Sequence, residues 1–145
     1  MTGRGGRRLD EVWRDGARAH LGITVAGFPN LFVLYGPNTN LGHNSIVYML
    51  ESQFGYVLQA VDRLAAGARS IDVRPEVQQR SNAAVQEAIR ATVWNSGCTS
   101  WYTTAAGRNT NNWPGFTFDY RRRLRRFDDA EFVVTTADES VSTAR

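Results

Sequence analysis

The stretch Leu31–Leu50 reads LFVLYGPNTNLGHNSIVYML, and it decides the fold. It opens with an apolar run, Leu31–Tyr35, whose lack of polar alternation is typical of a strand covered on both faces in a parallel sheet. A segment rich in Gly, Pro and Asn follows over Gly36–Asn44, and a long helical pattern begins at its end. The stretch therefore predicts a buried strand, a tight loop and a helix whose N-terminus is presented by the loop.

A strand–loop–helix turn of this kind gathers unpaired backbone N–H groups at one spot. That spot carries a partial positive charge and suits anionic or electron-rich ligand atoms. Many α/β proteins use the same turn only to connect two elements. The pattern alone therefore leaves ligand binding and simple connection both open.

Two long helices are predicted after the loop, over Asn44–Ala66 and Pro75–Trp94. In both, apolar residues recur at three- and four-residue steps, which is the period of a helix with a buried face. Asn44 is a good N-cap and Gly67 a good C-terminal stop, while Pro75 fits a first helical turn. The expected core face of the first helix consists of Ile46, Leu50, Phe54 (or Gln53), Val57, Val61 and Leu64. Val47, Leu58 and Ala65 widen this face.

The remaining segments are predicted from composition and turn residues. The chain divides into a mobile segment 1–8, a main body 9–133 and a disordered tail 134–145. Within the body, the expected pieces are a short helix over Leu9–Arg18 ended by Gly16, extended segments over Ala19–Gly27 and Ser70–Val73, and a long ordered loop pinned by aromatic side chains over Asn95–Tyr120.

Composition excludes several kinds of site. The single Cys98 can form neither an intrachain disulfide nor a metal site by itself, and His20 and His43 are the only histidines, so no metal site is predicted. No apolar run approaches the roughly 20 residues that span a bilayer. The N-terminus lacks the apolar core of a signal peptide, so a cytoplasmic location is expected.

The arginine run Arg121–Arg126 follows a segment rich in aromatic residues. Stacking aromatics beside basic residues are typical of single-strand nucleic-acid binding. No nucleic-acid-binding motif is present, however, and four nearby acids offset the charge, so a solvated basic face or pairing with another part of a larger protein is favoured. An exposed protein-interaction patch is the other alternative. The four acids are Asp119, Asp128, Asp129 and Glu131.

His43 is predicted to lie at the head of the first long helix. A general base would need a carboxylate, or a Ser or Cys nucleophile, within reach, and none is apparent nearby in sequence. Capping or packing is the alternative role, and no catalytic residue is predicted.

Several blocks of the sequence form a recognisable set: GFPNLFVLYGPNTN (27–40), TVWN (92–95), Cys98, SWY (100–102) and WPGF (113–116). These blocks resemble the C-terminal part of the FAD domain of flavin-dependent monooxygenases, most closely the Baeyer–Villiger type, and Glu51 matches a Glu on the helix after the loop. The resemblance covers roughly Gly3–Val133.

Two departures from the family pattern stand out. The N-terminal two-thirds of the pattern is absent: no GxGxxG follows a strand, and neither the FxGxxxHxxxW fingerprint nor an NADPH-binding domain with its Arg is found. His20 also stands where many relatives carry Tyr.

The resemblance implies a mostly helical α/β fragment of a flavoprotein with two dinucleotide-binding domains. It further implies the C-terminal portion of an FAD- and NADPH-dependent monooxygenase that inserts one oxygen from O2 into a ketone or aldehyde. This chain is expected to be inactive alone, to retain neither cofactor, and to need the missing N-terminal part as its partner. The residues expected beside the flavin are Asn38, Thr39, Asn40, Leu41, Gly42, His43, Asn44, Ser45 and Ile46.

Two other functions remain open. One is a non-catalytic interaction or regulatory remnant of a truncated flavoprotein gene. The other, favoured less, is a basic nucleic-acid-binding module, which would show strongly salt-dependent binding to oligonucleotides.

Overall fold

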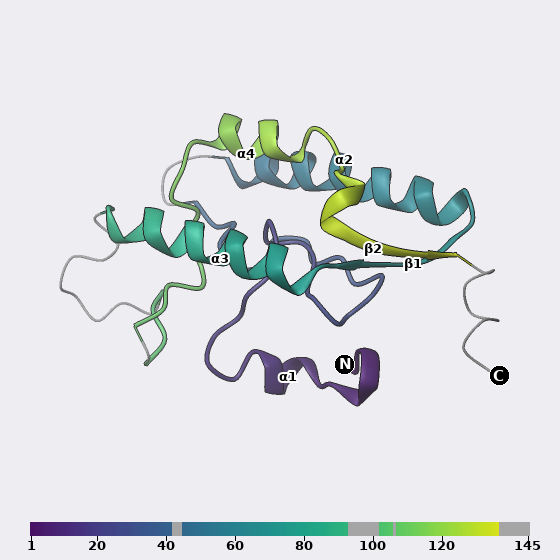
Figure 1. Ribbon diagram of the computed structural model, residues 1–145. Coiled ribbons are helices and arrows are strands. Elements are labelled where there is room, and N and C mark those ends of the chain that lie inside the picture. The colour runs from purple at the N-terminus through teal and green to yellow at the C-terminus, as the bar shows by residue number, and fades with distance from the viewer. Residues whose placement is uncertain (42–44, 93–101, 106, 137–145) are drawn as a thin grey trace.

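The computed structural model describes residues 1–41, 45–92, 102–105 and 107–136 (Figure 1). Helices and a two-stranded sheet make up the regular structure of these residues, in agreement with the predicted mostly helical α/β class. In chain order the elements are the short 3₁₀ helix η1 Arg4–Gly6, α1 Leu9–Val12, α2 Ile46–Ala65, β1 Ala68–Val73, α3 Pro75–Arg90, α4 Thr117–Leu124, the 3₁₀ helix η3 Asp129–Glu131, and β2 Phe132–Thr136.

The core lies between α2, α4 and the sheet. Helix α4 runs beside α2, and β1 pairs with β2 in antiparallel register, with Ile71 opposite Val134 and Val73 opposite Phe132 (Figure 1). Gly67 turns the chain from α2 into β1 with a φ of 109°, a conformation that favours glycine. The largest fully buried side chains of this core are Tyr56, Tyr120, Phe127, Phe132, Ile23, Met49 and Leu124.

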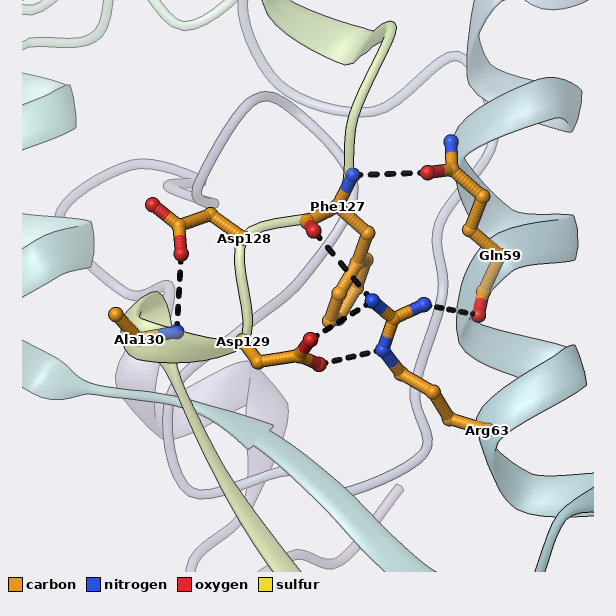
Figure 2. Close-up of polar contacts among 6 residues, drawn as sticks. All are labelled: Gln59, Arg63, Phe127, Asp128, Asp129 and Ala130. Carbon is orange, nitrogen blue, oxygen red and sulfur yellow. Dashed lines mark hydrogen bonds and ion pairs between the residues drawn. The ribbon is translucent and has the colours of Figure 1, made fainter.

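Arg63 of α2 fastens the turn that joins α4 to β2 (Figure 2). Its guanidinium forms a two-point ion pair with Asp129, donates a 2.7 Å bond to the Gln59 carbonyl oxygen, and lies 4.5 Å from the centre of the Phe127 ring. Gln59 Oε1 in turn accepts a 2.9 Å bond from the Phe127 N–H. The bond from Arg63 lowers the pKa of Asp129. Because Asp129 is exposed, the pair adds little stability by itself, and the planar guanidinium mainly fixes the geometry of the turn.

The two predicted helices are confirmed with shorter bounds. The helix predicted over Asn44–Ala66 is α2, Ile46–Ala65, and the helix predicted over Pro75–Trp94 is α3, which ends at Arg90. Asn44 and Trp94 lie outside the described residues. The residue at the N-cap position of α2 is Ser45. The extended segment predicted over Ser70–Val73 is part of β1.

The predicted buried strand Leu31–Tyr35 is wrong for this chain. Phe32 makes one isolated bridge to Thr24, the backbone turns before and after it, and Leu34 and Tyr35 are exposed. A strand needs neighbours that accept and donate its ladder bonds. Among the described residues no strand lies beside this segment, so its apolar side chains remain partly uncovered.

Four other segments also differ from their predictions. Ala19–Gly27 is a buried turn with a bridge between His20 and Thr24, not a strand. The loop predicted over Asn95–Tyr120 contains the start of α4 at Thr117, so the arginine run is mostly helical. The ends also carry structure: β2 includes residues 134–136 of the predicted tail, and segment 1–8 contains η1.

Candidate functional site

The loop before α2 is fastened to a segment about seventy residues further along the chain. The Asn38 N–H donates to the Thr110 carbonyl at 3.0 Å, and the Asn40 N–H donates to the Asn111 carbonyl at 3.0 Å. The Trp113 N–H returns a 2.8 Å bond to the Asn40 carbonyl. These bonds form a short parallel pairing, so the segments Gly36–Leu41 and Asn109–Trp113 form one unit, called here the loop clamp.

Asn38 shapes the loop clamp from inside. Its φ of 58° lies in the left-handed region that Asn tolerates better than most residues. Its buried Nδ2 donates to the carbonyl oxygens of Asn109 and Asn112, at 2.9 and 3.2 Å. Thr39 is also buried, and its hydroxyl donates to the Gly36 carbonyl at 2.7 Å. The Asn38 amide nitrogen and the Thr39 hydroxyl are therefore used within the chain.

Two glycines allow the loop to lie against the Ala19–Gly27 turn. A Cβ on Gly36 would stand 2.1 Å from the Gly22 carbonyl oxygen. A Cβ on Gly22 would stand 2.2 Å from Thr39 Cγ2, and Gly22 has a φ of 70°. Contacts this short are impossible for a side chain, so the two backbones can approach only because both positions are glycine.

Gln53 joins α2 to the loop and to α4. Its side chain is completely buried, and its Oε1 accepts a 2.9 Å bond from the Tyr35 N–H. Its Nε2 donates to the Tyr120 hydroxyl at 2.9 Å, and that hydroxyl donates to the Leu21 carbonyl at 2.7 Å. Burial raises the pKa of Tyr120 far above its ordinary value, so the hydroxyl stays protonated and able to donate. The relay fixes the start of the loop relative to α2.

The N-terminus of α2 has a different charge environment from the other α-helices. The first turn of α2 contains no acidic residue, whereas α1, α3 and α4 each have at least one acid there. The partial positive charge at this end is therefore not offset by a carboxylate of its own first turn. Such an end suits negative charge on a ligand.

The structure describes most of the predicted flavin-side residues. Asn38 and Thr39 are buried within the loop clamp, and Asn40 is half-buried, with its Oδ1 accepting a 2.6 Å bond from the Tyr35 hydroxyl. Leu41 and Ile46 pack against the core, and Ser45 is exposed. Gly42, His43 and Asn44 lie outside the described residues.

Sequence reasoning missed the Asn109–Trp113 half of the loop clamp. Asn109 Oδ1 accepts bonds from the N–H groups of Asn111 and Asn112, both at 3.0 Å, which folds this segment on itself. The Asn112 side chain is buried, and neither its Oδ1 nor its Nδ2 has a hydrogen-bond partner among the described residues. The closely spaced asparagines were the available signal, because Asn side chains favour such local backbone bonds.

His20 lies apart from the loop clamp, behind α3. Its Nε2 is 3.2 Å from Glu131 Oε2, but within the described part of the chain neither ring nitrogen has a partner in hydrogen-bond geometry. Burial, aided by the positive charge of Arg80, lowers the pKa of His20 to about 4. Burial also raises the pKa of Glu131. His20 is therefore a neutral, packed histidine near pH 7.

Comparisons with known proteins identify the family. No protein-family model matches the chain. A Baeyer–Villiger monooxygenase of Streptomyces coelicolor is 46% identical over 137 residues, and one of Pseudomonas aeruginosa is 47% identical over 139. The chain is homologous to part of the Baeyer–Villiger monooxygenases. The predicted family is confirmed.

The matches cover nearly all of this chain but a limited share of each Baeyer–Villiger monooxygenase. They include 92% and 94% of the chain, and the chain spans 26% of the length of both enzymes. An FAD-binding monooxygenase of Aspergillus niger is 42% identical over 141 residues.

Solved structures agree with the family. The structure of an oxidized steroid monooxygenase bound to NADP matches 94% of the chain with a TM-score of 0.80 and 30% identity, over 26% of its own length. A structure of OTEMO in complex with FAD and NADP, at 21% identity and a TM-score of 0.77, shares the fold. Within the described part of the chain, no helix has the length and apolar character of a membrane span, and no cluster of metal-binding side chains is found.

Proposed function

We propose that this chain forms the flavin-facing, C-terminal part of the FAD domain in an FAD- and NADPH-dependent Baeyer–Villiger monooxygenase of the cytoplasm. The observation that carries the proposal is the homology over nearly the whole chain, together with an α2 N-terminus that no first-turn carboxylate offsets. The partner is the rest of the enzyme, and the substrate is a small ketone or aldehyde.

The residues present fit a flavin on two grounds. The first is charge, because the N-terminus of α2 favours an electron-rich group. The second is the side-chain amide of Asn112, which has no partner among the described residues. The backbone of Asn112 forms a parallel β-bridge with Asn40 within the loop clamp. Buried polar groups are almost always paired, so this amide marks a place where a polar group from outside the described residues, such as a bound flavin, would complete the structure.

The bound flavin, reduced by NADPH, supplies the oxygen-activating chemistry that ends with one oxygen inserted beside a carbonyl. The residues of this chain position and polarise the flavin. The backbone N–H groups of Ser45 and Ile46 would hold the pyrimidine edge of the bound ring, where reduction adds negative charge. Their attraction strengthens as that charge grows, so they favour the reduced states. The loop clamp holds this helix end in place through Asn40 and its neighbours.

We further propose that the chain alone neither retains FAD nor oxidises substrates. It contains no Gly-rich turn after a strand, the feature that holds a dinucleotide pyrophosphate at a helix N-terminus.

The test uses the purified chain and a chimera. In the chimera, this chain replaces the matched 139 residues of the Pseudomonas aeruginosa enzyme. The visible spectrum of the chimera should contain the flavin absorption band at roughly 450 nm. The spectrum of the isolated chain should lack this band. A stoichiometric flavin in the isolated chain would contradict the second proposal. A soluble chimera without flavin would contradict the first and favour a non-catalytic remnant.

A further inference from the structure

Helix α2 has apolar residues on two faces. One face enters the core through Met49, Tyr56 and Ala60. Away from it, four large apolar side chains are exposed, among them Phe54 at 47% and Leu58 at 60%. Their positions advance by seven, four and three residues, so they follow one line along the helix. They are called here the α2 outer stripe, which consists of Val47, Phe54, Leu58 and Val61.

An outer stripe of this kind is unusual on a helix that faces water. A surface helix normally places charged or polar residues opposite its buried face, and a helix apolar on both sides belongs inside a larger body. Contiguous exposed apolar patches mark interaction sites.

The groove beside α2 carries positive charge. A hollow of about 620 Å³ lies between α2 and α4, and Glu51, Gly55 and Gln59 line it from α2. From α4 and its end come Phe118, Arg121, Arg122, Leu124 and Arg125. None of the four stripe residues lines this hollow, so the apolar stripe and the arginine-lined hollow are separate features along α2. A partner that covers both would be apolar against the stripe and acidic against the hollow.

We propose that the α2 outer stripe is the surface by which this chain docks onto the remaining part of the monooxygenase polypeptide. This inference rests on the proposed function. The length of the matched enzyme indicates what covers the stripe. Nearly all of the chain matches only 26% of the Pseudomonas aeruginosa enzyme, so that enzyme has a large remaining part that can pack on the stripe. A second copy fits less well, because it would bring a second set of α4 arginines to the same surface.

The stripe lies on the helix whose N-terminus is assigned to the flavin. Docking through the stripe would therefore hold α2 against the FAD-binding part and aim its N-terminus. This links the packing of the stripe to retention of the cofactor.

The experiment compares one substitution in two settings. Leu58→Glu is placed in the isolated chain and in the chimera with the Pseudomonas aeruginosa enzyme. The matched control is Ala84→Glu, which puts the same charge on an exposed position of α3. Melting temperature and FAD content per polypeptide are measured for all four proteins, and sedimentation gives the oligomeric state of the isolated chains.

In the isolated chain, Leu58→Glu and Ala84→Glu should have equal melting temperatures. In the chimera, Leu58→Glu should lower the melting temperature by roughly 5 °C or more, because it buries an unpaired charge, and FAD content should fall at least about tenfold, a loss of at least 1.4 kcal/mol in cofactor binding. The chimera with Ala84→Glu should match the unsubstituted chimera.

Two results would overturn the inference. One is a Leu58→Glu chimera whose melting temperature equals that of the control, whether or not FAD is bound. The other is a dimeric isolated chain that Leu58→Glu converts to monomers, since the occupant would then be a second copy. A chimera that lacks FAD but melts early with Leu58→Glu would contradict the proposed function and leave the docking surface supported.

Discussion

The two long helices of the chain differ on the faces they turn outward. Every large apolar side chain of α3 is at least partly covered, and its exposed positions are charged, polar or small. On α2, the exposed positions include the four apolar members of the α2 outer stripe. The exposed charged and polar residues of α3 are Glu76, Gln79, Arg80, Glu87 and Arg90.

This difference separates a face suited to solvent from a face suited to protein. Both helices bury one side in the same chain, so hydrophobic periodicity alone does not distinguish them. The chemistry of the second side does, because burying a Phe or Leu side chain is favourable by about 1.5–3 kcal/mol, and the stripe forgoes this in isolation. The α3 side of the chain is expected to remain at the surface of the assembled enzyme.

The largest predicted effect separates the two faces of α2 itself. Tyr56 is buried with its ring 5.1 Å from that of Phe127. Tyr56→Ala should lower the free energy of unfolding by about 3–5 kcal/mol, whereas Phe54→Ala in the isolated chain should cost less than about 1 kcal/mol. Urea unfolding measures both. Equal losses would mean that the outer stripe is packed within this chain.

A control at the same position isolates packing from polarity. The Tyr56 hydroxyl is buried and has no hydrogen-bond partner in the part of the chain that the structure describes. Tyr56→Phe keeps the ring and removes only that group, so it should be neutral or stabilise the chain by about 1 kcal/mol.

The second effect is a pH dependence on the inner side of α3. His20 has a pKa of about 4 in the fold, against an ordinary value of 6.5. The unfolded chain binds more protons at this residue, so stability is full above pH 6.5 and is lost as pH falls toward 4, by about 3 kcal/mol. Chemical unfolding between pH 4 and 7 should show this slope.

The control for the pH dependence is His20→Phe, which should remove the His20 contribution. Glu131, whose pKa is raised by burial, contributes in the opposite sense and remains in both proteins. The difference between the two pH profiles therefore reports His20. Parallel profiles would contradict a buried, neutral His20.

A smaller effect comes from the polar relay beneath the loop. Gln53→Leu leaves the Tyr35 N–H without its acceptor and should cost about 1–3 kcal/mol. Gln79→Leu on the outer face of α3 is the matched change and should stay within about 0.5 kcal/mol. The urea midpoints of the two variants measure the difference. Equal midpoints for Gln53→Leu and Gln79→Leu would show that the relay does not stabilise the loop.

The smallest effect on stability is expected for charges on the two outer faces. In the isolated chain, Leu58→Glu and Ala84→Glu should each change the free energy of unfolding by no more than about 0.5 kcal/mol. Binding of a hydrophobic dye should nevertheless fall with Leu58→Glu alone. Equal dye binding by the two variants would contradict the contrast between the faces.

Sequence patterns predicted the elements that depend on local periodicity. Both long helices were found because their apolar spacing lies within a few turns of chain. The extended piece Ser70–Val73 was also predicted, between the two helices. The strand at Leu31–Tyr35 was wrong because a strand depends on neighbours elsewhere in the chain, which periodicity does not reveal. The loop clamp was missed for the same reason, since Asn38 pairs with Asn109 across 71 residues.

Periodicity also left a choice between two adjacent residues. Phe54 and Gln53 both fitted the core face, and hydrophobicity favoured Phe54. The structure buries Gln53 and exposes Phe54, because the Gln53 amide satisfies both the Tyr35 N–H and the Tyr120 hydroxyl. When a helix has apolar residues on two faces, hydrophobic periodicity alone does not tell which face is buried.

The family resemblance predicted a flavin-side role for the loop before α2, and the contacts of its residues within the chain depend on distant partners. Asn38 and Thr39 matched the family block, yet their side chains hold the loop clamp together. The assignment of the loop and the α2 N-terminus to the flavin remains a proposal.

The flavin reduction potential of the chimera tests the central claim most directly. Ile46→Pro removes one backbone N–H from the first position of α2, where Pro is tolerated. Ile46→Ala removes the same side chain but keeps the N–H. If the α2 N-terminus faces the flavin, Ile46→Pro should lower the potential by about 10–20 mV relative to Ile46→Ala, which corresponds to about 0.5–1 kcal/mol for a two-electron couple. Equal potentials and equal FAD affinities in the two variants would contradict the claim.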